Sequence, residues 1–322
     1  MLNPNHKEPK VIDNVNVIDN VNVIDNVNET KRISLAEKNR HPRDEFIKFY
    51  EEGHIYDVTD PETGEMFHPT STTTLIHKYC NEFDADRIIK NFFVKPSNID
   101  EKYYYMTKEE IMHDFFINNN PSGGLKLIDK IKNKPFWIDS PYYGKTAKEI
   151  KQGWICNGKI QSEKGTHLHE CIEHFLDGLE VENDSKEYGF FLNFWKDFSL
   201  KYPQFKPYRL EWLIYDIEKR ISGSIDGVLE DDHGNVILLD WKRSKEIKFK
   251  NPFQKMKGYF SDLDDSNYSH YMCQLNIYRH MLQKNYNKKV VYLMLVILHP
   301  NNDTYQCIPI DMIDLTEFWN TL

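Results

Sequence analysis

Two aspartates and a lysine in the second half of the chain have the types and spacing of a cation-dependent site. Asp226 and Asp240 lie in segment 221–243, which the sequence predicts to be two strands joined by a polar turn at 231–235. A turn centred on His233 places both carboxylates opposite each other, with their Cβ atoms about 4.5–5.5 Å apart. Lys242 projects from the same face as Asp240, because side chains alternate along a strand. Carboxylates this close repel each other, and a hard divalent cation neutralises them.

The alternative is an ordinary hairpin with an Asp–Lys ion pair, and the residues that follow it favour a site. Residues 240–258 contain seven Lys and Arg against two acidic residues, although the whole chain carries a net charge of −9. A solvated charged loop would have the same composition. Beside a carboxylate pair, however, a basic strip is typical of a surface that follows a phosphate polymer. The candidate DNA contacts are Arg243, Lys245, Lys248 and Lys250, together with Ser224 on the preceding strand.

Other properties of the 322 residues limit the protein class. The five cysteines are odd in number and form no Cys-x-x-Cys pair, which favours reduced thiols over a disulfide framework or a zinc site. No apolar run reaches the roughly 20 residues that span a bilayer, and the N-terminus has no signal-peptide pattern. We therefore expect an intracellular protein of the cytoplasm or nucleus that is neither secreted nor in a membrane.

The elements that must position the candidate site lie mainly in the second half. The hexapeptide V-I-D-N-V-N occurs three times at 11–28, and we expect a disordered tail over residues 1–40. Residues 41–150 are predicted to form a mainly helical lobe with a hairpin at 53–69, and residues 151–322 to form the core. Helices are expected at 147–177, which Gly165 could interrupt, and at 185–199 and 269–284. Strands are expected at 208–217, 220–230, 235–243, 289–299 and 304–310. This pattern predicts an α/β (α+β) fold, with a central mixed sheet flanked by helices.

Further polar residues occupy these elements, and each alone has an ordinary structural explanation. His169 and Glu173 share one face of the first helix. Glu211 lies on the strand before the hairpin, where a charged residue at a strand edge would be unremarkable. Gln274 and Tyr278 are one turn apart on the last long helix, which otherwise reads as a packing helix.

Taken in chain order, the motifs that contain these residues resemble the PD-(D/E)XK nuclease superfamily, in particular its RecB-like exonuclease branch. The similar segments are G-T-H-L-H-E (165–170), G-S-I-D-G (223–227), L-L-D-W-K (238–242) and Q-L-N-I-Y (274–278), with T-S-T-T-T-L-I (70–76) upstream. The size of the chain is similar to that of stand-alone members in mitochondria, large DNA viruses and phages.

The resemblance implies a restriction-endonuclease-like core and a metal-dependent deoxyribonuclease, with Mg²⁺ or Mn²⁺ as cofactor. It implies that the metal ligands are His169, Asp226, Asp240 and the backbone carbonyl of Trp241. Lys242 would orient the attacking water or stabilise the transition state, and Gln274 and Tyr278 would hold DNA or brace the site. Glu211 is a second-rank candidate for positioning metal or water.

The expected partner is DNA, either single-stranded or with free ends, acted on by a monomeric exonuclease in replication, repair or recombination. Some relatives carry an iron–sulfur cluster on four cysteines, but only Cys273 and Cys307 lie beyond residue 171, so we expect no cluster. Two alternatives remain open at this stage: a structure-specific endonuclease, and a catalytically inert DNA-binding protein with the same fold.

Overall fold

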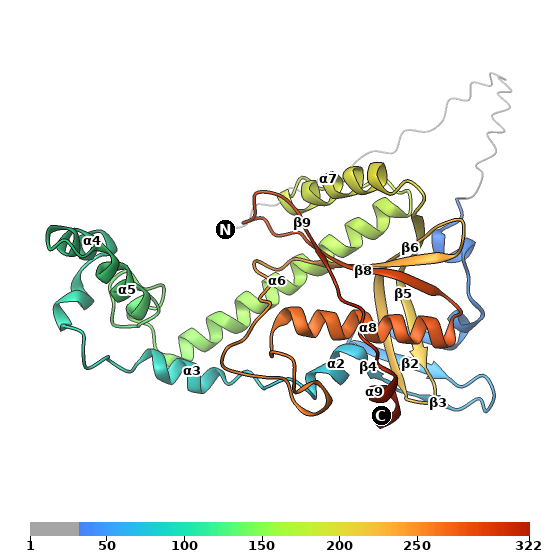
Figure 1. The fold of residues 1–322 in the computed structure, drawn as a ribbon, viewed down its shortest axis with the longest axis horizontal. Coiled ribbons are helices and arrows are strands. Elements are labelled where there is room, and N and C mark those ends of the chain that lie inside the picture. Colours follow the sequence, from blue (N-terminus) through green and yellow to red (C-terminus); the bar gives the residue numbers. More distant parts are fainter. Residues whose placement is uncertain (1–31) are drawn as a thin grey trace, which may run out of the picture. The chain divides into compact units, whose positions relative to one another are not determined.

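The protein was analysed as a computed structural model that describes residues 32–322 (Figure 1). The tandem repeat at 11–28 lies outside the described residues. Residues Ser34–Leu322 form one compact unit. Within residues 32–322, no helix is both long and apolar enough to cross a membrane.

A mixed six-stranded sheet forms the centre of this unit. Five of its strands follow the order β4-β6-β7-β8-β9. The sixth, β5, pairs with the edge of β6 that faces away from β4 and β7. Their bounds are β4 Thr70–Ser71, β5 Lys206–Asp216, β6 Ile221–Glu230, β7 Asn235–Lys242, β8 Lys289–Ile297 and β9 Gln306–Pro309. The pairs β4/β6 and β7/β8 are parallel, whereas β5/β6, β6/β7 and β8/β9 are antiparallel. The predicted α+β fold with a central mixed sheet is therefore confirmed.

Strand β6 has two different neighbours along one of its sides. β5 follows it along nearly its full length, from Ile221 to Glu230. On the opposite side, β4 pairs with residues 221–222 and β7 pairs with residues 227–230. Residues 223–226, which include Asp226, therefore lie between the stretch that pairs with β4 and the stretch that pairs with β7. We call this gap the fork in β6. On this side of β6, backbone pairing is interrupted at the position where the sequence places its candidate site, while β5 continues on the other side.

Helices cover both faces of the sheet, and the alternation of side chains along β7 explains why. Leu239 and Trp241 pack with the helices α6 (Ala147–Leu176) and α7 (Lys186–Lys201). Val236 and Leu238 pack with α8 (Asn267–Asn285), α2 (Thr72–His77) and α9 (Thr316–Thr321) on the other face. Each apolar side chain of β7 thus enters one of two separate cores.

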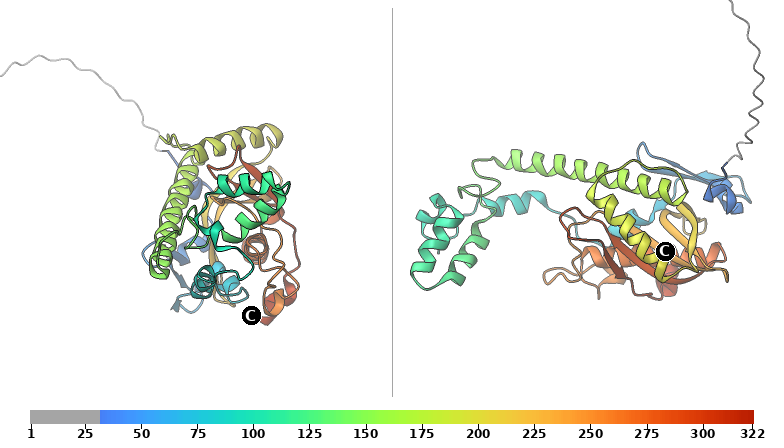
Figure 2. Two further views of the ribbon diagram at one scale, coloured as in Figure 1. Left: turned by 90° about the vertical axis from the view of Figure 1, so that its left-hand side faces the viewer. Right: turned by 90° about the horizontal axis from the view of Figure 1, so that it is seen from above.

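Helix α6 runs without a break for 30 residues (Figure 2). It starts at a capping box in which Thr146 and Glu149 satisfy each other's backbone N–H groups. The expectation that Gly165 could interrupt it is wrong. The backbone at Gly165 stays in the right-handed helical conformation, so the glycine lowers the stability of the helix without ending it.

The first half of the unit contains a small sheet and a group of short helices. Strands β1 (Ile47–Tyr50), β2 (Ile55–Thr59) and β3 (Met66–Phe67) are antiparallel, and β2 and β3 form the hairpin predicted at 53–69. The helices are α3 (Ala85–Phe92), α4 (Lys108–Ile117) and α5 (Pro121–Ile131), with 3-10 helices at Pro42–Phe46 and Glu101–Tyr105. Tyr104, Ile111, Ile131 and Trp137 form a small core between them.

The domain boundaries expected from the sequence do not coincide with these elements. The boundary at residue 150 falls within α6, and β4, from the expected lobe, is part of the main sheet. The end of the expected tail is also folded: residues Leu35–Lys38 form α1, where the Leu35 N–H donates to Asp177 Oδ1 at 2.7 Å. The side chain of Asn39 donates to the carbonyl of Tyr208 on β5 at 2.7 Å.

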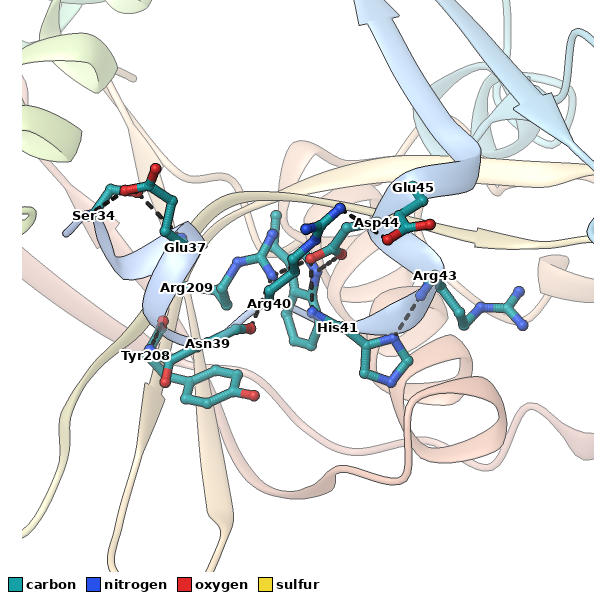
Figure 3. Close-up of polar contacts among 11 residues, drawn as sticks. Ser34, Glu37, Asn39, Arg40, His41, Arg43, Asp44, Glu45, Tyr208 and Arg209 are labelled. Carbon is teal, nitrogen blue, oxygen red and sulfur yellow. Dashed lines mark hydrogen bonds and ion pairs between the residues drawn. The ribbon is translucent and has the colours of Figure 1, made fainter.

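Asp44, in the 3-10 helix Pro42–Phe46, fixes β5 from its edge (Figure 3). Its Oδ2 accepts hydrogen bonds from Arg209 Nη1 at 2.5 Å and from the His41 N–H at 2.9 Å. Its Oδ1 accepts from the indole N–H of Trp212 at 3.0 Å. The Arg209 side chain is only 8% exposed, so this is a nearly buried ion pair. It holds β5 on both sides of Glu211.

Candidate metal centre

Side chains from α6, β5 and β6 meet at the fork in β6. His169 Nδ1 lies 3.4 Å from Glu211 Oε1 and 3.7 Å from Asp226 Oδ2. One ligand atom from each of these three residues lies within 4.8 Å of the other two. The sequence predicts Glu211 only as a second-rank candidate, but in the structure it lies at the centre of the site with His169 and Asp226.

The hairpin has the register that the sequence predicts. Gly227 pairs with Leu239 and Val228 with Leu238, as a turn centred on His233 requires. The next step of this register would join Asp226 to Asp240, but the ladder ends one residue earlier. There, Asp226 Oδ2 accepts a hydrogen bond from the backbone N–H of Trp241 at 2.8 Å.

Asp240 and Lys242 share one face of β7, as expected from their spacing. Lys242 Nζ lies 2.8 Å from each oxygen of Asp240, but it has hydrogen-bonding geometry only toward Oδ1. Asp240 is 2% exposed, and its Oδ2 has no hydrogen-bond partner among the described residues. A buried carboxylate oxygen without a donor is costly unless a cation or water completes its environment.

The backbone of Glu211 is in an unusual conformation for a strand. Its φ is +40°, in the left-handed region that residues with a Cβ rarely adopt. The ladder of β5 with β6 includes Leu210 and Trp212 but not Glu211. The Ser224 hydroxyl donates to Glu211 Oε2 at 2.8 Å, which holds the carboxylate toward His169. Local strain of this kind persists only where surrounding contacts enforce it, here those of Asp44 on both sides.

The crowding of charge shifts the pKa values at this centre. Burial and the charge of Asp240 raise the pKa of Asp226 to about 7, although His169 opposes this. Burial alone would lower the pKa of His169, but Asp226 and Glu211 outweigh it and raise the pKa to about 9. Burial likewise works against the Lys242 ammonium, but Asp240 and Asp226 raise its pKa above the usual value. The centre thus gathers more negative charge than its two basic side chains offset.

The donor set fits a divalent cation. It combines carboxylate oxygens of Glu211 and Asp226 with one imidazole nitrogen, and Asp240 lies close enough for its charge to act on Asp226. This mixture suits Mg²⁺ and, through the imidazole, Mn²⁺. His169 Nε2 lies 2.9 Å from the carbonyl oxygen of Trp241 and must donate to it, because a carbonyl only accepts. Asp240 Oδ2, which has no hydrogen-bond partner among the described residues and only the Lys242 ammonium beside it, is free to take a further ligand.

Gln274 and Tyr278 support this centre from α8. Gln274 Nε2 donates to the Tyr278 hydroxyl at 3.0 Å, and the tyrosine side chain is buried. A Cβ on Gly223 would lie only 2.4 Å from Tyr278 Cε1, so this position in β6 requires glycine. A glycine within a strand often marks close approach by a ligand or another backbone, and at Gly223 the approaching group is the tyrosine ring.

The expected DNA contacts fall into two groups. Lys245, Lys248 and Lys250 are exposed on the segment after β7. Arg243 instead forms an ion pair with Glu187 of α7 at 2.7 Å, with side chains 7% and 12% exposed, and also bonds Gln161 of α6. Arg243 therefore joins β7 to the helices, and Ser224 is occupied by Glu211. Neither side chain is presented to solvent for a phosphate.

Two tyrosines near the centre were not identified from the sequence. The ring centroid of Tyr271 lies 5.1 Å from Lys242 Nζ. It precedes Gln274 by three residues, so helical spacing could have indicated it. Burial, then the charges of Glu211 and Asp226, raise the pKa of Tyr56 on β2 to about 12. No local sequence pattern indicates that Tyr56 lies near the centre, because it belongs to the small sheet and is far in sequence from the other residues of the site.

Comparisons with known proteins add no relative to this description. No protein-family model matches the chain, and no curated protein matches it in sequence.

Proposed function

We propose that the chain is a divalent-metal-dependent deoxyribonuclease that hydrolyses phosphodiester bonds at DNA ends or in single strands. The observation that carries this proposal is the convergence of His169, Glu211 and Asp226 at the fork in β6, beside the Asp240–Lys242 pair. The order of motifs that resemble the RecB-like exonuclease branch supports the same activity. The proposed cofactor is Mg²⁺ or Mn²⁺, and the proposed state is a monomer.

In this proposal each side chain has a defined task. His169, Asp226 and Asp240 hold the metal, and Glu211 takes a direct or water-mediated place beside them. When bound, the metal lowers the pKa of a water molecule and offsets charge on the scissile phosphate. Lys242, kept protonated by Asp240, supplies a positive charge to the phosphate. Gln274 and Tyr278 fix the packing of α8 against β6.

The segment after β7 supports DNA as substrate. Lys245, Lys248 and Lys250 alternate there with the aromatic rings of Phe249 and Phe253, and Phe253 is 91% exposed. Basic side chains that follow a phosphate backbone, interleaved with rings on which bases stack, are typical of single-strand binding. A strongly exposed phenylalanine has no packing role within the described part of the chain.

A cleavage assay tests the proposal and separates it from both alternatives. The purified protein is incubated with 5′- or 3′-labelled single- and double-stranded DNA, with and without Mg²⁺ or Mn²⁺. Release of mononucleotides or short products from an end is expected only with metal. Internal cuts would instead identify an endonuclease, and retarded migration without cleavage would identify a DNA-binding protein.

Replacing Lys250 with alanine is expected to weaken DNA binding without abolishing cleavage at saturating DNA. One lost phosphate contact lowers the slope of log K against log salt by about 0.7 for single-stranded DNA. Fluorescence anisotropy at several salt concentrations measures this slope. The control is Lys289→Ala, an exposed lysine at the opposite end of the sheet from Asp240. Equal slopes for both variants would remove Lys250 from the DNA-binding surface.

Thermal stabilisation by Mg²⁺ or Mn²⁺ is expected to increase from pH 6 to pH 8. The folded protein keeps protons on Asp226 and His169 up to about pH 7 and 9, so their contribution to stability is present at low pH and lost as pH rises through those values. A cation must displace these protons, which raises its affinity up to about tenfold per pH unit for each proton released. Differential scanning fluorimetry measures the effect, and Asp226→Asn is expected to lose most of it. A metal-induced shift independent of pH would contradict this site.

A further inference from the structure

Three side chains from two segments far apart in sequence meet at a second point, where α8 begins. Cys80 follows α2, Asp265 precedes the N-cap Ser266 of α8, and His270 lies in the first turns of that helix. His270 Nε2 lies 3.2 Å from Cys80 Sγ and 2.5 Å from Asp265 Oδ1. One ligand atom from each residue lies within 4.8 Å of the other two.

The contacts of the histidine distinguish this cluster from a catalytic triad. In a triad the nucleophile and the carboxylate bind opposite nitrogens of the imidazole, so that a proton can pass between them. Here Cys80 and Asp265 both approach Nε2, which has either one proton or one lone pair to offer. One sulfur, one nitrogen and one oxygen are therefore gathered at a single point, within the distance of one another that ligands of one ion have.

We propose that Cys80, Asp265 and His270 bind a zinc ion. Thiolate and imidazole are the ligands that zinc prefers, whereas Mg²⁺ takes oxygen ligands, so this site and the centre at Asp226 select different metals. Zinc–ligand bonds are about 2.0 to 2.3 Å long, which places two ligands of one ion about 3 to 4 Å apart. The Nε2–Sγ separation of 3.2 Å lies within this range, whereas the Nε2–Oδ1 separation of 2.5 Å is a direct contact that an ion must open. The fourth position is left to water.

Neighbouring groups orient the proposed ligands. Asp265 Oδ2 accepts hydrogen bonds from the backbone N–H of Asn81 at 2.7 Å and from its side-chain amide at 2.6 Å, while Oδ1 faces His270. In the metal-free chain the Cys80 thiol donates to the carbonyl of Ile76 at 3.3 Å, one turn back, and the thiolate gives up this bond when it binds zinc. Hydrogen bonds that fix the direction of a metal ligand are a regular part of protein metal sites.

The same cluster is joined to the basic segment after β7. The Asn81 amide donates to the Lys255 carbonyl at 2.7 Å, and the Asn251 amide donates to the Asp265 carbonyl at 2.7 Å. Zinc at this point would therefore fasten the end of α2, the start of α8 and the end of the basic segment together. Its role is to hold these elements in place, independent of any hydrolytic step.

Cobalt substitution in the full-length protein tests the proposal. After removal of metals with a chelator, addition of Co²⁺ is expected to give one tetrahedral ion per chain with a thiolate-to-cobalt charge-transfer band. Zinc, but not excess Mg²⁺, should remove this band. A wild-type protein that shows no such band would overturn the proposal, whether or not any variant folds.

Variants assign the band to this cluster. Cys80→Ala and His270→Gln are expected to lose it and to weaken zinc binding by about 100-fold or more in a chelator competition, since losing even a group that only orients a ligand costs about 10- to 100-fold. The matched control is Cys171→Ala, a buried thiol with His167 at 3.7 Å but no third ligand at the sulfur. His169→Gln should also retain the band. Retention of full zinc affinity by folded Cys80→Ala would equally overturn the proposal.

Discussion

Replacement of Asp226 with asparagine is expected to lower the rate of DNA cleavage by at least about 1,000-fold. The change removes one carboxylate of the proposed metal site, and electrostatic groups aimed at a reacting centre are commonly worth that much. Asparagine keeps an oxygen that can accept from the Trp241 N–H, so the hairpin should remain folded. Single-turnover cleavage at saturating Mg²⁺ measures the loss of activity.

The stability of the same variant gives an independent readout. Because the pKa of Asp226 is raised to about 7, its ionised form destabilises the metal-free fold at higher pH. Metal-free Asp226→Asn should therefore unfold at a higher temperature than the wild type at pH 8. The control is Asp232→Asn, an exposed aspartate in the turn after β6, which should change neither property. Cleavage at the wild-type rate by Asp226→Asn would exclude this residue from the reaction.

Replacement of Asp44 with alanine is expected to destabilise the fold by about 3–5 kcal/mol, the usual effect of removing one partner of a buried ion pair. Arg209 would keep its charge beside the Asn39 carbonyl and the Trp212 ring, without a carboxylate. The indole N–H of Trp212 would also lose its acceptor. Urea unfolding followed by tryptophan fluorescence measures the difference.

The neighbouring residue provides the comparison for this experiment. Glu45→Ala removes an ion pair with Arg40 at 2.9 Å in which both side chains are well exposed, and it should cost no more than about 1 kcal/mol. Because Arg209 and Trp212 flank Glu211, Asp44→Ala should also lower cleavage in conditions where the protein is still folded. Equal unfolding midpoints for the two variants would contradict the role given to Asp44.

The elements around the candidate centre could be predicted because their sequence patterns are local. The hairpin register follows from the polar turn at 231–235, and α8 follows from its apolar spacing. The conformation of Glu211 could not be predicted in the same way. Its positive φ is held by the contact of Asp44 with Arg209 and by that of Ser224 with Glu211, both of which exist only in the folded chain.

The sequence shows which charged residues are present, but it does not show which of them form ion pairs within the fold. Arg243 follows the Asp-x-Lys motif directly and reads as part of a basic strip, yet it pairs with Glu187 from a different helix. Nothing in the order of residues distinguishes it from Lys245, which is exposed. The cluster of Cys80, Asp265 and His270 has no motif at all, since its members come from two distant segments. Contacts of this kind become visible only when tertiary structure is known.

The fork in β6 also has a consequence for the order in which the chain folds. Thr70 of β4 pairs with Ile221, while Asp240 and Lys242 pair with Leu295 and Ile297 of β8. Pairings between such distant segments form slowly, because closing a long loop costs chain entropy before any new contact compensates for that cost. During synthesis β7, which carries Asp240 and Lys242, lacks its partner strand until β8 has left the ribosome. We therefore expect Asp240 and Lys242 to be held in their final positions beside the proposed metal site only late in synthesis, after β8 has paired with β7.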